Sequence, residues 1–357
     1  MRKHYIDNLR IICILLLFPF HAAMCFNSFG EQFYITGSPS AALSQIIVTV
    51  YPWWMSLLFA IAGMSSAYAL KKRTAKEYAQ ERVLRLLVPI VSGLVLIVPP
   101  QAYYADVFHN GYSGGYFEHY IKFFTNVTDL YGSDGCFTPA QLWFALYLFV
   151  ISLVCLPLMR WYSKRENRPD FSRISFPLLL TGGFLLLVLS SFVLDIGGKS
   201  VGEFCVCFLI GFFVLSDGAM QEKLQKNAAW LGAAWAVLML TRSLMSCFAL
   251  PDDSVLWGLE YRALELFGIL GAIGLGGRFL NFENRLTRYF SAAAFPLYLF
   301  HQTILVMCAY YIVRVVPSTG LQYLSIVLSS FVLSVGAYEI CRRFAAARFL
   351  FGMKSRR

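Results

Sequence analysis

Two residues in the first apolar run have the types and spacing for acid–base chemistry. Arg10 and His21 lie eleven residues apart within residues 6–26. On a helix this is almost three turns, so both side chains share one face, about 16 Å apart along the axis. If the helix crosses a bilayer from Arg10, His21 lies near the middle of the hydrocarbon layer, where an ionisable group is costly and usually functional. We therefore expect a catalytic histidine; the alternative is a neutral histidine bonded to an adjacent helix.

A second histidine, His301, lies five residues after Pro296 in another apolar run. It is fourteen residues beyond Thr287, where that run is expected to enter the membrane. At about 1.5 Å per residue this depth again lies beyond the shallow interface. We expect His301 and His21 to line one cavity.

The most basic stretch, residues 70–89, supplies candidates for binding a phosphorylated ligand. It contains Lys72, Arg73, Arg82 and Arg85. The last two are i, i+3 neighbours expected on one helix face, and a planar guanidinium can bond two phosphate oxygens at once. The stretch suits docking of a cytosolic ligand such as coenzyme A as well as anchoring the topology. The sequence contains nothing like a glycine-rich phosphate loop, so a nucleotide triphosphatase is not expected.

The composition indicates a membrane protein that positions these residues on several spans. Apolar residues make up 58% of the 357 residues and charged residues 14%, and the mean hydropathy is +0.60. Soluble domains do not reach these values. Nine scattered cysteines form neither a disulfide framework nor a metal-ligand cluster, so no metal is expected. Runs of about 20 apolar residues predict ten spans, near 9–26, 44–70, 83–105, 142–159, 176–194, 200–216, 228–250, 257–278, 289–313 and 320–341.

The distribution of basic residues orients these spans. Assigned to alternate sides, 25 of the 30 Lys and Arg residues fall on the side of the termini. By the positive-inside rule both termini are expected in the cytoplasm. The same bias accounts for most of the net charge of +10, so no nucleic-acid partner is expected. We predict one membrane-embedded domain, an all-α polytopic protein of about ten transmembrane helices over residues 1–357.

One long segment, residues 106–141, is expected outside. It is rich in aromatic residues, Tyr116 among them, with glycines between. Such rings suit a re-entrant or interfacial cap that stacks on sugars. An aromatic belt at the level of the lipid headgroups explains the same composition equally well.

Four sequence blocks together resemble the integral-membrane acyltransferase-3 superfamily, especially its branch resembling glucan-biosynthesis protein C. The blocks are IDNLR followed by ten residues and His21, KKRT with ERVLRLLVP, GCFTPAQLWFALYLF, and FPLYLFHQT. The resemblance covers nearly the whole chain. It implies a ten-helix enzyme of the bacterial cytoplasmic membrane that uses a cytoplasmic acyl-CoA, acetyl or succinyl, to O-acylate an external glycan or glucan. Arg10 matches its Arg-to-His motif, and Arg82 and Arg85 match its basic motif, although many members have Arg-X-Arg there.

The residues and the resemblance agree on a mechanism. A neutral histidine suits a general base acting on a sugar hydroxyl that attacks the thioester, and a covalent acyl-histidine relay is the other route. Acyl-CoA is then a co-substrate, and no cofactor is bound permanently. The expected site comprises His21, Arg10 and His301 for catalysis; Arg82, Arg85, Lys72 and Arg73 for the donor; and Trp143, Glu260, Arg262 and Tyr116 for the acceptor.

The competing class is a secondary transporter of a small anionic solute. Ten spans, interrupted helices and ionisable residues at the midplane suit a carrier as well. The absence of an internal repeat and the clustered arginines favour the enzyme.

Overall fold

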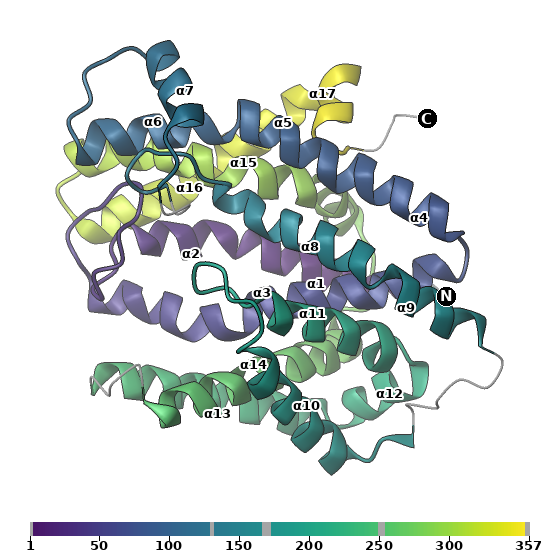
Figure 1. Ribbon diagram of the computed structural model, residues 1–357. Coiled ribbons are helices and arrows are strands. Elements are labelled where there is room, and N and C mark those ends of the chain that lie inside the picture. Colours follow the sequence, from purple (N-terminus) through teal and green to yellow (C-terminus); the bar gives the residue numbers. More distant parts are fainter. Residues whose placement is uncertain (1–2, 129–131, 166–172, 249–253, 354–357) are drawn as a thin grey trace. The chain divides into compact units, whose positions relative to one another are not determined.

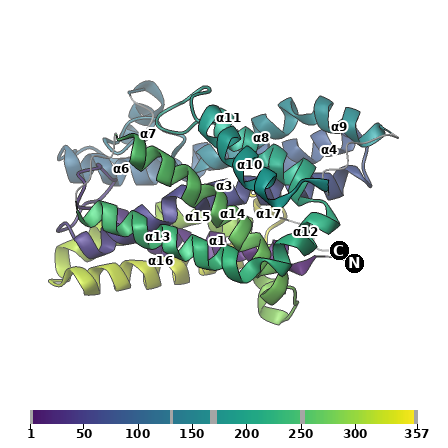
Figure 2. The same cartoon turned by 90° about the horizontal axis from the view of Figure 1, so that it is seen from below.

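The structure is a computed structural model that describes residues 3–128, 132–165, 173–248 and 254–353. Its regular elements over these residues are helices (Figures 1 and 2), so the predicted all-α class is confirmed. In chain order they are α1 (His4–Leu15), α2 (Leu17–Met24), α3 (Ala41–Leu70), α4 (Ala75–Arg82), η1 (Val83–Leu87), α5 (Val88–Leu96), α6 (Val98–His109), α7 (Tyr116–Thr125), η2 (Ala140–Leu142), α8 (Trp143–Val154), α9 (Leu156–Lys164), α10 (Phe176–Ser190), α11 (Val201–Ile210), η4 (Gly211–Leu215), α12 (Gly218–Lys226), α13 (Ala228–Cys247), α14 (Val255–Phe279), α15 (Arg285–Val315), α16 (Thr319–Cys341) and α17 (Ala345–Leu350).

Within the described residues, six helical segments are long and apolar enough to cross a membrane, and up to eight if two bent pairs each form one span. The chain is therefore a multi-pass membrane protein. The six are 4–24, 41–70, 75–109, 228–247, 285–315 and 319–341, and the bent pairs are 140–164 and 201–226. The two other expected spans correspond to α10, which has 15 residues, and to α14, which carries several charged residues. Ten spans stay a prediction.

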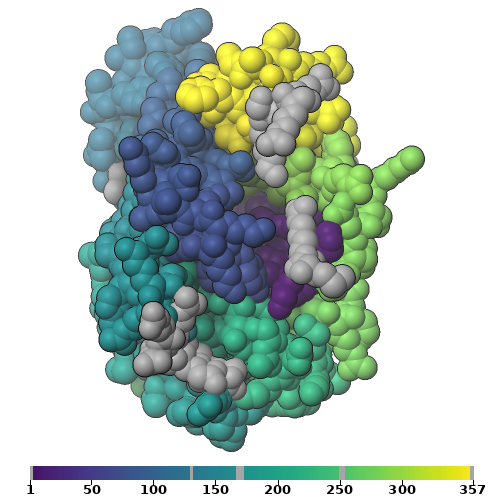
Figure 3. Space-filling model, turned by 90° about the vertical axis from the view of Figure 1, so that its right-hand side faces the viewer, coloured from purple at the N-terminus to yellow at the C-terminus, as the bar shows by residue number. Residues whose placement is uncertain are grey.

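The chain divides into two compact units. Unit 1 contains residues 1–13, 48–82 and 147–288, and unit 2 contains residues 14–47, 83–146 and 289–357. In unit 1, α14 packs against α10, α12 and α13, and α13 runs beside α14 in Figure 2. In unit 2, α2 packs against α16, and α5 against α6 and α17. Figure 3 shows α17, in yellow, at the surface.

Unit 1 depends on direct contact between helix backbones. A Cβ atom on Gly63 of α3 would lie 1.9 Å from the carbonyl oxygen of Phe208 on α11. A Cβ atom on Gly211 of η4 would lie 2.0 Å from the carbonyl oxygen of Ala60. Real side chains do not fit at such distances, so glycine is required at both positions for α3 to pack this closely.

The first apolar run is helical with a break at its proline. Helix α1 ends at Leu15 and α2 begins at Leu17. Pro19 has no N–H to donate to the carbonyl of Leu15, and it is tolerated because it lies in the first turn of α2, where N–H groups need no helical partner. His21 is the fifth residue of α2, and one residue, Leu16 in α conformation, separates this helix from α1, which carries Arg10. The two helices together form the single candidate span 4–24.

Candidate active site

Helices α2 and α15 bring the two predicted histidines together inside unit 2. The ring centroids of His21 and His301 are 5.1 Å apart, with their planes tilted by 34°. His301 is fully buried, and His21 is partly exposed. The expectation that these two side chains meet is confirmed, although 280 residues of sequence separate them.

Aromatic rings enclose this pair. Phe33 stacks on His21 with a centroid distance of 6.0 Å and an interplanar angle of 14°. Phe18 meets His301 edge-on at 6.0 Å, and Tyr298 stacks on His301 at 6.2 Å. The two imidazoles therefore lie in an apolar surround that excludes much of the water with which they would otherwise bond.

The hydrogen bonding of the pair is incomplete. Nδ1 of His301 lies 2.6 Å from the carbonyl oxygen of Tyr298. Because a carbonyl only accepts, Nδ1 carries the proton, and in the neutral ring Nε2 presents its lone pair. That Nε2 and Nδ1 of His21 are buried without a hydrogen-bond partner among the residues that the structure describes. Buried polar atoms without a partner are rare and costly, so this is a place where a polar ligand would be bound.

A polar network that sequence reasoning missed holds the His301 segment in place. The hydroxyl of Tyr298 donates to the carbonyl oxygen of Gln141 at 2.5 Å and accepts from the N–H of Ala145 at 3.2 Å. The side chain of Gln141 in turn donates to the carbonyl oxygen of Leu299 at 3.0 Å. The sequence does contain a signal for this network, because an amide side chain lies inside the apolar GCFTPAQLWFALYLF block, and a buried amide needs hydrogen-bond partners.

Arg10 lies in unit 1, whereas both histidines lie in unit 2. Its guanidinium pairs with Asp7 at 2.9 Å and donates to Ser65 at 3.0 Å. Its catalytic and donor-binding roles stay predictions.

The basic candidates for the donor lie around α4. Arg73 pairs with Glu81 at 2.7 Å, Lys72 is exposed, and Arg82 ends α4 with its guanidinium 4.6 Å from the ring centre of Tyr78. Arg85 lies in the π-helical turn η1. The expected α-helical i, i+3 geometry of Arg82 and Arg85 is therefore replaced by a wider turn.

Two of the acceptor candidates lie in unit 2. Trp143 begins α8 and is partly exposed. Tyr116 begins α7, with its ring 5.6 Å from that of Tyr103. Their acceptor roles stay predictions.

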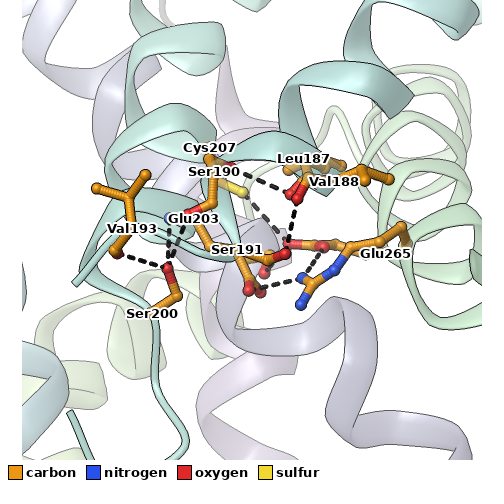
Figure 4. Close-up of polar contacts among 11 residues, drawn as sticks. Leu187, Val188, Ser190, Ser191, Val193, Ser200, Glu203, Cys207 and Glu265 are labelled. Atoms are coloured by element: carbon orange, nitrogen blue, oxygen red, sulfur yellow. Dashed lines mark hydrogen bonds and ion pairs between the residues drawn. The ribbon is translucent and has the colours of Figure 1, made fainter. Parts of the chain in front are cut away.

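The other two acceptor candidates, Glu260 and Arg262, lie on α14 in unit 1. The predicted pair of Arg262 with Glu265 is confirmed at 2.8 Å, and the same Nη1 atom contacts Glu203 of α11 at 2.6 Å. Glu265 also accepts from Cys207 at 3.5 Å, and Figure 4 shows these polar contacts. Glu260 pairs separately with a buried arginine of α13, at 3.1 Å. Sequence spacing found the local pair and missed the partners on other helices.

Over the described residues, no group of three or more His, Cys, Asp or Glu side chains is arranged to hold a metal ion.

Comparisons with known proteins identify the family of the chain. The model of the acyltransferase-3 family, described as an acyltransferase domain, matches residues 3–339. The chain is 23% identical over 382 residues to proteins named glucans biosynthesis protein C from Salmonella paratyphi A, Salmonella agona and Salmonella heidelberg. Each alignment covers 99% of this chain and 95% of the relative. No solved structure matches the chain.

Proposed function

Because the chain belongs to the acyltransferase-3 family, and is therefore a membrane acyltransferase, we propose that it transfers an acetyl or succinyl group from cytoplasmic acyl-CoA to a hydroxyl of an extracytoplasmic glucan or other glycan. The name of the relatives, glucans biosynthesis protein C, supports a glucan-related acceptor.

The observation that carries this proposal is the pair of unpartnered nitrogens in unit 2. A sugar that donates one hydroxyl to Nδ1 of His21 and a neighbouring hydroxyl to Nε2 of His301 satisfies both buried atoms. One imidazole removes the hydroxyl proton while the oxygen attacks the thioester carbonyl. The carbon–oxygen bond forms, the carbon–sulfur bond breaks, and the proton leaves with the coenzyme A thiol.

The two histidines differ in how well the structure defines them as bases. His301 has its tautomer set by the bond from Nδ1 to Tyr298, which resembles the way a hydrogen bond orients the histidine of a catalytic triad. His21 lies at the position expected from the Arg-to-His motif and has its own unpartnered nitrogen. We assign the base to His21 and the contact with a neighbouring hydroxyl of the sugar to His301.

The donor is proposed to bind on the basic side of the chain. Acyl-CoA carries phosphates that suit the guanidinium groups of Arg10, Arg82 and Arg85, with Lys72 and Arg73 contributing charge. Coenzyme A acts here as a co-substrate that enters and leaves.

We also propose that ten spans place both termini in the cytoplasm of a bacterial cell, with the enzyme in the cytoplasmic membrane. The charge bias of the sequence supports this orientation. A reporter fused after residue 357 and another inserted at residues 110–113 are expected on opposite sides of the membrane. Both reporters on one side would mean that the span count is wrong by an odd number.

The function is tested with the purified protein in lipid vesicles. Acyl-CoA labelled in the acyl group is supplied on one side and a glucan on the other. Label on the glucan, in ester linkage, supports the proposal. Uptake of a small anion with no transfer of label would instead support the secondary transporter.

A further inference from the structure

The buried nitrogen of His21 makes no hydrogen bond that would orient the ring. Catalytic imidazoles are usually oriented by a hydrogen bond from a ring nitrogen to a carboxylate or a carbonyl. Nδ1 of His21, which the proposed function directs at the hydroxyl, has no protein partner among the residues that the structure describes. The ring of Phe33 lies nearly parallel to it instead, with an interplanar angle of 14°. A nearly parallel ring beside the imidazole, with centroids 6.0 Å apart, limits rotation about the Cβ–Cγ bond, because a large turn moves the imidazole edge toward the neighbouring ring.

Phe33 belongs to a short folded loop, residues 27–36, which we call the positioning loop. The ends of this loop are tied together, since the N–H of Gly37 donates to the carbonyl of Cys25 at 2.7 Å. Within the loop, the side chain of Asn27 bonds the carbonyl of Glu31 at 2.7 Å and accepts from its N–H at 3.1 Å. Phe33 itself is 6% exposed. The loop is therefore an ordered platform for one aromatic ring.

A second segment, distant in sequence, fixes the tip of the positioning loop. Nε2 of His109, at the end of α6, lies 2.8 Å from the carbonyl oxygen of Phe33, so Nε2 donates. The hydroxyl of Ser133 donates to the carbonyl oxygen of Gln32 at 3.1 Å. Both donors come from the aromatic segment 106–141, and all of these residues belong to unit 2.

The end of α6 is itself secured. Asp106, one turn before His109, is 1% exposed and accepts from Lys122 of α7 at 2.5 Å and from Asn110 at 2.8 Å. The carboxylate thus joins α6 to α7 through charge-assisted bonds in a buried setting, where they are stronger than at the surface. His109 therefore donates its hydrogen bond from a helix end that is held in place by α7.

We propose that Phe33 is the positioning residue for His21, and that the segment 106–141 controls the catalytic imidazole through the bond from His109 to the backbone of Phe33. This inference rests on the proposed function for its kinetic consequences. It extends that function because it gives the segment 106–141, which we expect to face the acceptor, a role in orienting His21. The segment has this role without contacting the reacting atoms.

The first test removes the stack. Phe33→Leu keeps an apolar side chain and loses the aromatic ring, and Phe29→Leu is the matched control, because Phe29 lies in the same loop and is 48% exposed. We expect kcat of Phe33→Leu to fall about 10- to 100-fold, as for a small misplacement of a catalytic group, with KM for acyl-CoA unchanged within about twofold. Phe33→Tyr keeps the stack and should stay near the wild-type rate.

The second test changes the bond to the loop without touching the aromatic ring. His109→Leu removes the donor, whereas the amide of His109→Gln can still donate to the carbonyl of Phe33. We expect His109→Leu to lower kcat and His109→Gln to recover most of it. Equal loss in both variants would overturn the role of the hydrogen bond.

A third measurement is independent of acyl transfer. Diethyl pyrocarbonate modifies accessible neutral imidazoles, and mass spectrometry of the peptide that contains His21 gives the rate. We expect faster modification of His21 in Phe33→Leu than in the wild type or in Phe29→Leu. Equal rates in the two leucine variants would overturn the inference. If the wild-type protein transfers no acyl group, the proposed function is wrong. The modification rates of His21 in the two leucine variants still test whether Phe33 positions His21.

Discussion

Replacement of the two site histidines by glutamine, singly and together, is the most direct perturbation of the proposed chemistry. Glutamine keeps much of the volume and some hydrogen bonding but cannot take up a proton. Loss of a general base lowers the rate by about 10²–10⁴-fold, equivalent to about 2.7–5.4 kcal/mol of transition-state stabilisation at 1.36 kcal/mol per tenfold. We expect His21→Gln to fall in this range with KM for acyl-CoA little changed.

The geometry predicts how the two changes combine. Ring centroids 5.1 Å apart bring both imidazoles to one sugar, so we expect both rings to contribute to the same transfer step. Residues that act as a unit are strongly non-additive. The double variant should therefore lose little more than the worse single variant, whereas independent contributions would multiply to about 10⁴–10⁸-fold.

The assay is the initial rate of label transfer from acyl-CoA to glucan in vesicles, over a range of pH. His4→Gln is the matched control, because His4 pairs with Glu283 at 3.1 Å in unit 1, outside the site. The wild-type kcat/KM should fall on the acid side, since a protonated imidazole is no base. A fully active His21→Gln enzyme, or multiplicative losses in the double variant, would refute the mechanism in which both imidazoles contribute to one transfer step.

Three further outcomes are expected. Gly63→Ala should prevent stable folding, because its Cβ would lie 1.9 Å from a carbonyl oxygen. Gly218→Ala is the control and should fold, because open space surrounds that position. The unfolding temperatures of the two variants test this. Alanine at both Arg82 and Arg85 should raise KM for acyl-CoA about tenfold or more while membrane insertion is intact, and an unchanged KM would move the donor site elsewhere. Burial lowers the pKa of His119, against a smaller opposing effect of Asp106, so as pH falls through about 6.5 the unfolded state takes up a proton that the folded state resists. The unfolding temperature should therefore drop more between pH 7 and pH 5 in the wild type than in His119→Gln, and equal drops would count against this.

The sequence alone predicts a site residue correctly where a polar side chain interrupts an apolar run, and it predicts a contact where both partners lie close together on one helix. His21 and His301 were identified because ionisable groups inside apolar runs are rare, and their meeting was predicted from similar depth. The pair of Arg262 with Glu265 followed from i, i+3 spacing on one helix. In each case the deciding information lies within a few turns of the chain.

The contacts that sequence analysis missed all join distant segments. Glu203 meets Arg262 from a separate helix, and His109 bonds the backbone of Phe33 from 76 residues away. A backbone carbonyl has no side-chain identity, so no residue pattern marks it as an acceptor. The π-helical turn that contains Arg85 was not predicted for a related reason, since it depends on packing rather than on the local sequence alone.

Whether a buried polar group has all its hydrogen bonds indicates whether its role is structural or chemical. Both oxygens of Glu265 are bonded, one by Ser56 at 2.6 Å and the other by Arg262 at 2.8 Å. A carboxylate satisfied in this way gains nothing from a ligand, and truncating one partner would leave a buried charge uncompensated. Glu260 differs, because its Oε1 is buried without a hydrogen-bond partner among the described residues. By the argument that selects His21 and His301, Glu260 is therefore a better candidate than Glu265 for binding a ligand.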